Sequence, residues 1–276
     1  MNFQALAEHF AIVYSILTVR YVVLAGLAYL IIWKLLGSRL AHKIIQPDRP
    51  PKRKNFIHEI KYSLATFLIF GLVGVFIFES TNQGWTLVYK DVAQFGWPYF
   101  VFSVVLTILL HDTYFYWTHR FMHWKPVFKT MHLVHHRSTN PTPWAAFSFH
   151  PTEAIVEAGI IPIVVFIYPL HPGAIALFAL YMTFLNVLGH LGYELFPAGF
   201  TRSKFTFWHN TSTHHNMHHR YFNCNYGLYF NWWDRLMKTN HERYHEAFEE
   251  VAGRERVTAP APAPIAPASP GLNALR

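Results

Sequence analysis

Residues 97–123 read WPYFVFSVVLTILLHDTYFYWTHRFMH, an apolar segment that ends in histidines. A membrane-spanning helix needs about 20 mainly apolar residues, and Trp97–Trp117 meets that length. The last turn and a half of this span already contains His111 and Asp112. His119 and His123 follow four residues apart, which places both imidazoles on one face of a helix. The stretch therefore predicts a membrane helix that presents histidines at one end.

Three other apolar segments are candidates for membrane-spanning helices. Ala11–Trp33 is interrupted only by Arg20, Tyr62–Phe78 carries no charge, and Ala154–Leu191 has a turn signal near its middle that predicts a helical hairpin. Charged residues make up only 14% of the chain, against roughly 25% in a typical soluble domain. This composition excludes an ordinary soluble enzyme and an intrinsically disordered protein. We predict an all-α integral membrane protein with four to five transmembrane helices, the number depending on whether residues 154–191 cross the bilayer fully.

Basic residues are distributed unevenly between the predicted loops. Lys90 alone lies between the second and third spans. Eight basic residues lie between the first and second spans: Lys34, Arg39, Lys43, Arg49, Lys52, Arg53, Lys54 and Lys61. Because Lys and Arg accumulate in cytoplasmic loops, the first loop is predicted to be cytoplasmic and the second external. Residues 118–153 and those after Leu191 then form a cytoplasmic helical cap. A membrane therefore explains the net charge of +8 without nucleic acid.

Histidine is the most unusual component of the sequence, with 19 residues against 15 acidic ones. Three groups have helical spacing: His119 and His123; His132, His135 and His136; and His215, His218 and His219. Residues three and four apart are neighbours on a helix, so each group is expected to direct its nitrogens to one point. With His190, these groups supply nine imidazoles, enough for two metal ions with a coordination position left open. Ligands of this kind suit iron, copper, zinc and nickel alike.

Several of the other histidines and the single cysteine need no functional explanation. His9, His42, His58 and His171 are interpreted as ordinary polar residues. A bis-histidine haem protein needs two or four ligands and leaves most of the nine unexplained. The single cysteine, Cys224, excludes a disulfide framework, a cysteine-ligated iron–sulfur cluster and a thiolate zinc site.

The order and spacing of the histidines resemble those of a known superfamily. His111-Asp-Thr-Tyr-Phe-Tyr-Trp-Thr-His-Arg-Phe-Met-His123 and His132-x-x-His-His136 are similar to the first two histidine boxes of the fatty acid hydroxylase/sterol desaturase superfamily. The third box of that superfamily is matched by Asn210-Thr-Ser-Thr-His-His-Asn-Met-His-His219, which is followed by Asn225-Tyr-Gly227 and Trp233-Asp-Arg235. Matching segments also occur at residues 150–153 and 189–194. The resemblance covers roughly residues 95 to 240 and implies a non-haem di-iron enzyme that uses O2 on a lipid C–H bond.

The resemblance and the spacing together imply a set of site residues. The expected metal ligands are His119, His123, His132, His135, His136, His190, His215, His218 and His219. His111, His150 and His214 rank below them as metal candidates. Asp112, Glu153, Glu194 and Asp234 lie near ligand positions and are candidates to accept ring N–H bonds from the ligands.

The implied cofactors are two non-haem iron ions, with O2 as co-substrate. Side chains supply only acid–base and nucleophilic chemistry, so an unactivated C–H bond requires an oxidising metal. The sequence has no dinucleotide loop, flavin pattern or cysteine cluster, so an external electron donor is implied: a ferredoxin, a rubredoxin or a cytochrome b5-like carrier with its reductase. The active site is expected on the cytoplasmic side of a bacterial inner membrane or of the endoplasmic reticulum.

The expected domain organisation follows from these assignments. Residues 1–94 supply the N-terminal membrane helices and a basic cytoplasmic loop, and residues 95–250 form the hydroxylase/desaturase-like catalytic domain. Residues 251–276 form a disordered tail, because the alternation of Ala and Pro over Thr258–Pro270 cannot build a packed core.

Two other functions stay open at this point. One is a membrane metal-binding or transport protein without redox chemistry, which would place ionisable residues along a path through several spans. The other is a zinc protease, because His241-Glu242-Arg-Tyr-His245 fits the H-E-x-x-H pattern. Within the oxidative interpretation, the substrate can be a sterol, a fatty acyl chain, a carotenoid or an alkylglycerol-type lipid, and the reaction hydroxylation or desaturation.

The loop asymmetry predicts the orientation of the chain in the membrane. We expect reporter fusions at Gln83 and in the C-terminal tail to report opposite sides of the membrane, because the third span crosses once and the 154–191 hairpin returns to the side on which it starts. The measurement is the activity of compartment-specific reporters such as alkaline phosphatase and green fluorescent protein. Reports from the same side for both fusions would contradict the assignment.

Overall fold

The computed structural model describes residues 3–255, and within that range the chain is helical and contains isolated bridges but no strand. The α-helices are α1 Phe3–Ala28, α2 Arg53–Asn82, α3 Gly96–Met122, α4 Lys125–Met131, α5 Leu133–His136, α6 Pro151–Ala158, α7 Ile160–Ile167, α8 Pro172–Gly189, α9 Ser212–Tyr221, α10 Trp232–Leu236 and α11 Tyr244–Ala252. A π-helix, Tyr29–Leu35, extends α1, and short 3-10 helices occupy Ala41–Lys43, Val92–Gln94 and Pro143–Phe147.

The C-terminal tail expected from the sequence lies for the most part outside the described residues. Helix α11 continues through Val251 and Ala252, both of which are buried, so it enters the segment assigned to the tail by two residues. The Ala/Pro stretch Thr258–Pro270 falls beyond residue 255, where the structural description ends.

Within residues 3–255, four helices are long and apolar enough to cross a membrane: Phe3–Leu35, Arg53–Asn82, Gly96–Met122 and Pro172–Gly189. The count is thus the lower of the two expected values. The hairpin predicted over residues 154–191 has unequal legs, because its first leg is divided at Gly159 into α6 and α7, each of 8 residues. Only its second leg, α8, reaches the length of a span.

The surface of the long helices is suited to lipid. On α1, the side chains of Ile12, Ile16, Val19, Val23 and Leu27 are each about half exposed or more. An exposed apolar surface of this extent is not tolerated in water, whereas hydrocarbon accepts it at no cost. With four such helices, the protein is an integral membrane protein.

The long helices pack around aromatic side chains and glycines. Tyr21 of α1 is 1% exposed and donates to the carbonyl of Trp144 at 2.8 Å, which fixes the 143–147 segment between α1 and α2. Gly74 of α2 faces Val13 of α1 so closely that a Cβ atom would lie 2.6 Å from a Val13 methyl carbon. Small residues at such contacts let membrane helices approach closely.

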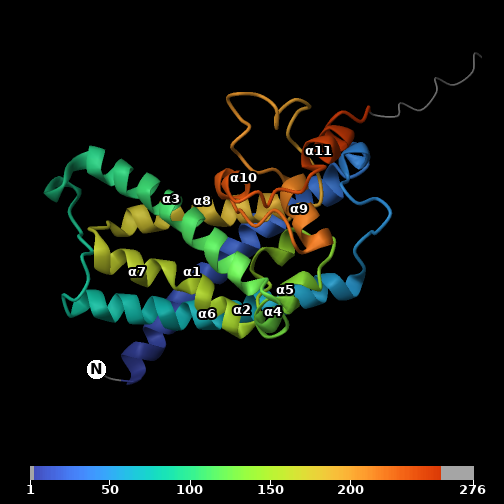
Figure 1. Cartoon of the computed structure of the whole chain (residues 1–276). Helices are drawn as coiled ribbons and strands as arrows, with labels where there is room; N and C mark the ends of the chain where they lie inside the picture. Colours follow the sequence, from blue (N-terminus) through green and yellow to red (C-terminus); the bar gives the residue numbers. More distant parts are fainter. Residues whose placement is uncertain (1–2, 256–276) are drawn as a thin grey trace, which may run out of the picture.

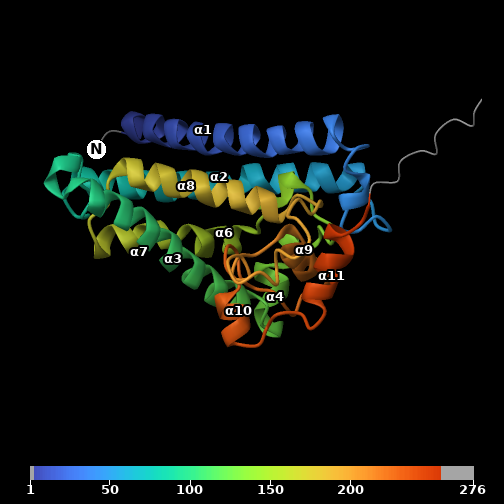
Figure 2. The same cartoon turned by 90° about the horizontal axis from the view of Figure 1, so that it is seen from above.

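The short helices gather at one end of the bundle. In Figures 1 and 2, α4, α5 and α9 to α11 lie at the end where α3 and α8 finish, away from the N-terminus. The basic loop after α1 reaches the same end: Trp33 Nε1 donates to the carbonyl of Leu191 at 2.9 Å, and the backbone N–H of Ile45 donates to the carbonyl of Gly192 at 3.1 Å. The helical cap and the basic loop therefore share one side of the bundle.

Candidate metal centre

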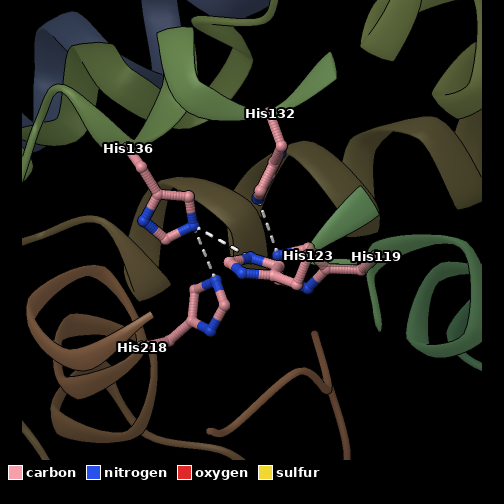
Figure 3. A group of neighbouring side chains, drawn as sticks. All are labelled: His119, His123, His132, His136 and His218. Atoms are coloured by element: carbon pink, nitrogen blue, oxygen red, sulfur yellow. Dashed lines mark hydrogen bonds between the residues drawn. The ribbon is translucent and has the colours of Figure 1, made fainter. Parts of the chain in front are cut away.

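One group of five imidazoles comes together from three parts of the chain. It consists of His119, His123, His132, His136 and His218, whose nearest ring nitrogens all lie within 4.8 Å of one another. His119 lies in the last turn of α3, and His123 directly follows that helix. His132 directly precedes α5, and His136 is its last residue. His218 lies on α9. Figure 3 shows the five rings directed at a common centre. Nε2 of His136 lies 3.1 Å from Nε2 of His123 and 3.0 Å from Nε2 of His218.

A second group of four imidazoles lies beside the first. It consists of His135, His190, His215 and His219, whose ligand nitrogens also lie within 4.8 Å of one another. His190 follows the last residue of α8, so the end of a membrane helix contributes to this group. The ring centroids of His136 and His219, which belong to different groups, are 4.8 Å apart. The two groups thus form one double site at the helix ends.

Two of the three histidine clusters, at residues 132–136 and 215–219, are divided between the groups, which corrects the expectation that each cluster converges on one point. His132 and His136 belong to the first group, while His135 between them belongs to the second. On α9 the arrangement is reversed, because His215 and His219 belong to the second group and His218 to the first. With 3.6 residues per turn, positions i and i+4 are about 40° apart around the helix and i+3 lies about 60° to the other side. The pattern i, i+3, i+4 therefore suits a pair of neighbouring ions.

Backbone carbonyls fix the ring orientation of three of these histidines. Nδ1 of His119 donates to the carbonyl of Tyr226 at 2.8 Å, Nδ1 of His218 to Cys224 at 2.7 Å, and Nδ1 of His190 to Asn186 at 2.7 Å. A neutral imidazole carries one proton, so a ring that donates from Nδ1 presents a bare lone pair at Nε2. These three Nε2 atoms all point into the double site.

The contacts in the second group cannot all be hydrogen bonds. Nε2 of His190 lies 3.0 Å from Nε2 of His215 and 3.3 Å from Nε2 of His219, and the last two atoms are 3.2 Å apart. A neutral ring nitrogen carries either a proton or a lone pair, so two members of any such triangle are alike and repel each other. A cation that accepts all the lone pairs removes this repulsion. The donor set therefore fits a bound metal ion.

Protonation of the rings does not offer another solution. Burial, with the neighbouring imidazoles, lowers the pKa of His215 and His219 well below the ordinary value. Burial also lowers the pKa of His190 to about 4 and that of His123 to about 2. The imidazoles are consequently neutral at physiological pH, which is the form that binds metal.

One of the four candidate carboxylates contacts an expected ligand. Glu153 is 1% exposed, and its Oε1 accepts from Nδ1 of His132 at 2.7 Å. A carboxylate in this position fixes the tautomer of a metal ligand and strengthens its Nε2 as a donor to metal.

The other three carboxylates hold the backbone around the site. Asp112 accepts from the backbone N–H of Tyr229 at 2.9 Å and of Phe230 at 3.2 Å. Glu194 accepts from the backbone N–H of Thr213 at 2.9 Å, in the first turn of α9. Asp234 accepts from the backbone N–H groups of Tyr226 and Gly227 at 2.9 and 2.7 Å, and it also lies 3.5 Å from Nε2 of His214.

The remaining histidine candidates lie outside both groups. His111 is 4% exposed among Phe115, Phe178 and Tyr229. His150 caps α6 through Thr152, and Nε2 of His214 lies 3.1 Å from the side-chain oxygen of Asn240.

The two histidines of the H-E-x-x-H pattern do not lie on one face of a single helix. His241 precedes α11, which begins at Tyr244, and its ring stacks on Tyr221 with centroids 4.6 Å apart. His245 lies inside the helix. Since the two rings are held by different elements, neither joins a group of metal-binding side chains among the residues described.

Sequence reasoning did not identify the carbonyls of Asn186, Cys224 and Tyr226 as part of the site, because a carbonyl gives no signal in residue type. The motif Asn225-Tyr-Gly227 contributes to the site through its backbone conformation. Asn225 adopts a positive φ of 57°, and its side chain donates to the carbonyl of His214 at 3.0 Å. The turn presents two neighbouring carbonyls to His218 and His119.

Comparison with known proteins places the histidine region in one family. The family model described as fatty acid hydroxylase matches residues 104–239, a range that contains all nine histidines. The Delta(7)-sterol 5(6)-desaturase ERG3B of Gibberella zeae is 32% identical to this chain over 78% of its length, and the match covers 62% of the relative.

Two other relatives give similar values. The Delta(7)-sterol 5(6)-desaturase erg3C of Aspergillus fumigatus is 33% identical over 64% of this chain and 60% of the relative. The lathosterol oxidase of Homo sapiens is 31% identical over 64% of this chain and 58% of the relative. The chain thus spans about three fifths of the length of these curated relatives. No solved structure gives a significant match.

Replacement of His190 tests the ligand set at its least obvious member. We expect His190→Ala to weaken metal binding by at least about 10–100-fold, because loss of a direct ligand costs no less than loss of an orienting partner. The measurement is elemental analysis of detergent-purified protein after dialysis against a chelator. His241→Ala is the matched control, since its ring lies outside both groups. Wild-type metal content in His190→Ala would remove His190 from the set and return His111, His150 and His214 to consideration.

Proposed function

Since the chain belongs to the fatty acid hydroxylase/sterol desaturase superfamily, we propose that it is a membrane oxidoreductase that uses two iron ions and O2 to oxidise a C–H bond of a lipid. The observation that carries the proposal is the double histidine site, in which nine neutral imidazoles form groups of five and four. Imidazole ligands suit iron but do not select it over other first-row metals. The family membership is what favours iron.

Iron bound here would supply the oxidising power that side chains lack. The five-membered group would be held by His119, His123, His132, His136 and His218, and the other group by His135, His190, His215 and His219. Glu153 would hold His132 in the correct tautomer, and the carbonyls of Asn186, Cys224 and Tyr226 would do so for His190, His218 and His119. Eight of the nine rings are at most 3% exposed, so the surrounding protein excludes bulk water from the site.

An apolar cavity of about 530 Å³ inside the bundle supports a lipid substrate. Its walls include Leu17 of α1, Phe70 and Ile77 of α2, and Phe178 and Met182 of α8. Its volume lies in the range of sites that enclose organic molecules of drug size. The apolar part of these walls suits hydrocarbon. The nine histidines gather at one end of the bundle and not along a path through it, which argues against the transport alternative.

The names of the relatives favour a sterol among the possible lipids and desaturation among the possible reactions. All three matched proteins described above are named as sterol desaturases or as lathosterol oxidase. Hydroxylation and desaturation both begin with removal of a hydrogen atom from carbon. We therefore extend desaturation of a sterol-like lipid to this chain as the first reaction to test.

An external electron donor is part of the proposal, and the surface near His123 is suited to it. His123 is the one partly exposed ring among the nine. Lys125 and Lys129 of the adjoining α4 are exposed. A basic rim beside the accessible edge of the site would attract an acidic carrier such as a ferredoxin, a rubredoxin or a cytochrome b5-like domain.

The side of the membrane is also proposed. The basic loop between α1 and α2 lies at the same end as the histidines, since Trp33 and Ile45 bond to Leu191 and Gly192 directly after His190. If the basic loop is cytoplasmic, as the excess of Lys and Arg favours, the site is cytoplasmic too.

Comparison of lipid extracts from cells with and without the gene tests the activity. We expect a lipid to decrease and a product lighter by two mass units, or heavier by sixteen, to replace it in mass spectra. Cells that express His135→Ala/His219→Ala should show no product, because the second group loses two of its four nitrogens. His241→Ala should behave as wild type. An unchanged lipid profile in cells that accumulate iron-loaded wild-type protein and a competent electron donor would contradict the proposal.

A further inference from the structure

The cavity described above has three ionisable side chains together at one end of its apolar wall. Arg20 of α1, His111 of α3 and Glu157 of α6 all line it. Ionisable residues inside a membrane bundle are costly and rare, and they mark functional sites when they face a cavity. A structural role would require these groups to satisfy one another or to reach the bilayer surface.

None of the three is satisfied by the described part of the protein. Arg20 Nε, His111 Nδ1 and Glu157 Oε1 are buried atoms without a hydrogen-bond partner, and no ion pair joins Arg20 to Glu157 among residues 3–255. A buried polar atom without a partner destabilises the folded protein, because it loses its hydrogen bond to water and gains none in return. Three such atoms around one cavity indicate a ligand that brings its own polar atom.

Chain direction places the three groups at the end of the cavity nearest the histidines. Along α1 the lining runs from Val13 to Arg20, and along α8 from Pro172 to Met182, so both helices advance toward the cap. Lys90, which precedes α3, lines the opposite end. The ionisable end is thus the inner end.

Two short connections link the inner end to the metal centre. Glu157 lies one helical turn after Glu153, whose carboxylate contacts His132. His111 lies eight residues before His119 on α3, a rise of about 12 Å. The ring of Phe115 lies between them, 6.2 Å from His111 and 4.9 Å from His119 between centroids.

The cavity also has a route from the bilayer. A surface groove of about 480 Å³, lined by Val19 and Val23 of α1 and Leu180 of α8, shares Ile16 and Arg20 with the cavity. Arg20 thus borders both spaces. A lipid that enters sideways between α1 and α8 would meet the guanidinium before its polar group reached His111 and Glu157.

The donor and acceptor character of the three groups selects one kind of polar atom. Arginine only donates, a carboxylate accepts, and a neutral imidazole does one at each nitrogen. A fatty carboxylate could accept from Arg20 but has no hydrogen to donate, so it would leave an acceptor oxygen of Glu157 and the acceptor nitrogen of His111 unpaired. A hydroxyl group both donates and accepts, so it can bond to Arg20 and to Glu157 or His111.

We propose that Arg20, His111 and Glu157 bind the hydroxyl group of a lipid at the inner end of the cavity and so determine which lipids the protein accepts. The inference rests on the proposed function only in taking the bound lipid to be the substrate. It places the oxygen-bearing end of that lipid toward the histidines and its hydrocarbon along the apolar wall.

The test compares lipids that differ in a hydroxyl alone: cholestanol against cholestane, and 1-octadecanol against octadecane. Dissociation constants are measured on the full chain in detergent, without turnover. We expect the alcohol of at least one pair to bind wild type about tenfold more tightly than its hydrocarbon, which corresponds to about 1.4 kcal/mol. Arg20→Gln, Glu157→Leu and His111→Phe should each lower this ratio. Glu8→Gln, an exposed change on α1, should not.

The outcomes separate the inference from the proposed function. A variant that binds the hydrocarbon normally but no longer prefers the alcohol supports the inference, because misfolding would weaken both. Equal binding of alcohol and hydrocarbon by wild type, or an unchanged preference in all three variants, overturns it. Preference for the alcohol in a protein that oxidises no lipid would retain the inference and remove the proposed function.

Discussion

Bare imidazole lone pairs converge in a space almost closed to water, and the rest of the structure depends on compensating them. Three rings are forced to present Nε2 without a proton, because their Nδ1 atoms donate to the carbonyls of Asn186, Cys224 and Tyr226. Burial and mutual proximity disfavour protonation of the rings. A cation between the rings relieves both problems. We therefore regard metal binding as part of what stabilises this fold, since ligand binding to the native state alone adds to stability.

The carboxylates near the site act mainly on the backbone. Asp234 binds the N–H groups of Tyr226 and Gly227, and so fixes the turn whose carbonyls orient two ligands. Glu194 occupies the N-terminal end of α9, where a negative charge also interacts favourably with the helix dipole. In this arrangement the membrane helices supply the frame, and the buried carboxylates keep the histidine-bearing segments in register with it.

The sequence identifies the histidines of the site, but it does not predict how they are divided between the two groups. The spacing at residues 119–123, 132–136 and 215–219 identifies eight of the nine members of the two groups, because helical neighbours are determined by spacing alone. The ninth, His190, stands outside these clusters. The spacing does not reveal that His135 and His218 belong to a different group from the other histidines of their own clusters, since that depends on where a second helix packs. The break at Gly159 was also missed, because residues 154–167 are apolar except for Glu157 and hydropathy does not distinguish one long helix from two short ones. The unpartnered state of Arg20, His111 and Glu157 appears only when α1, α3 and α6 are placed around one cavity.

Anomalous X-ray diffraction at the iron absorption edge, from crystals of protein purified with its native metal, tests the central claim most directly. The account predicts two peaks per chain, one among His119, His123, His132, His136 and His218, and the other among His135, His190, His215 and His219. The same crystals measured just below the iron edge should lose most of that signal. A single peak, peaks that persist below the iron edge, or metal bound at His241 and His245 would contradict it.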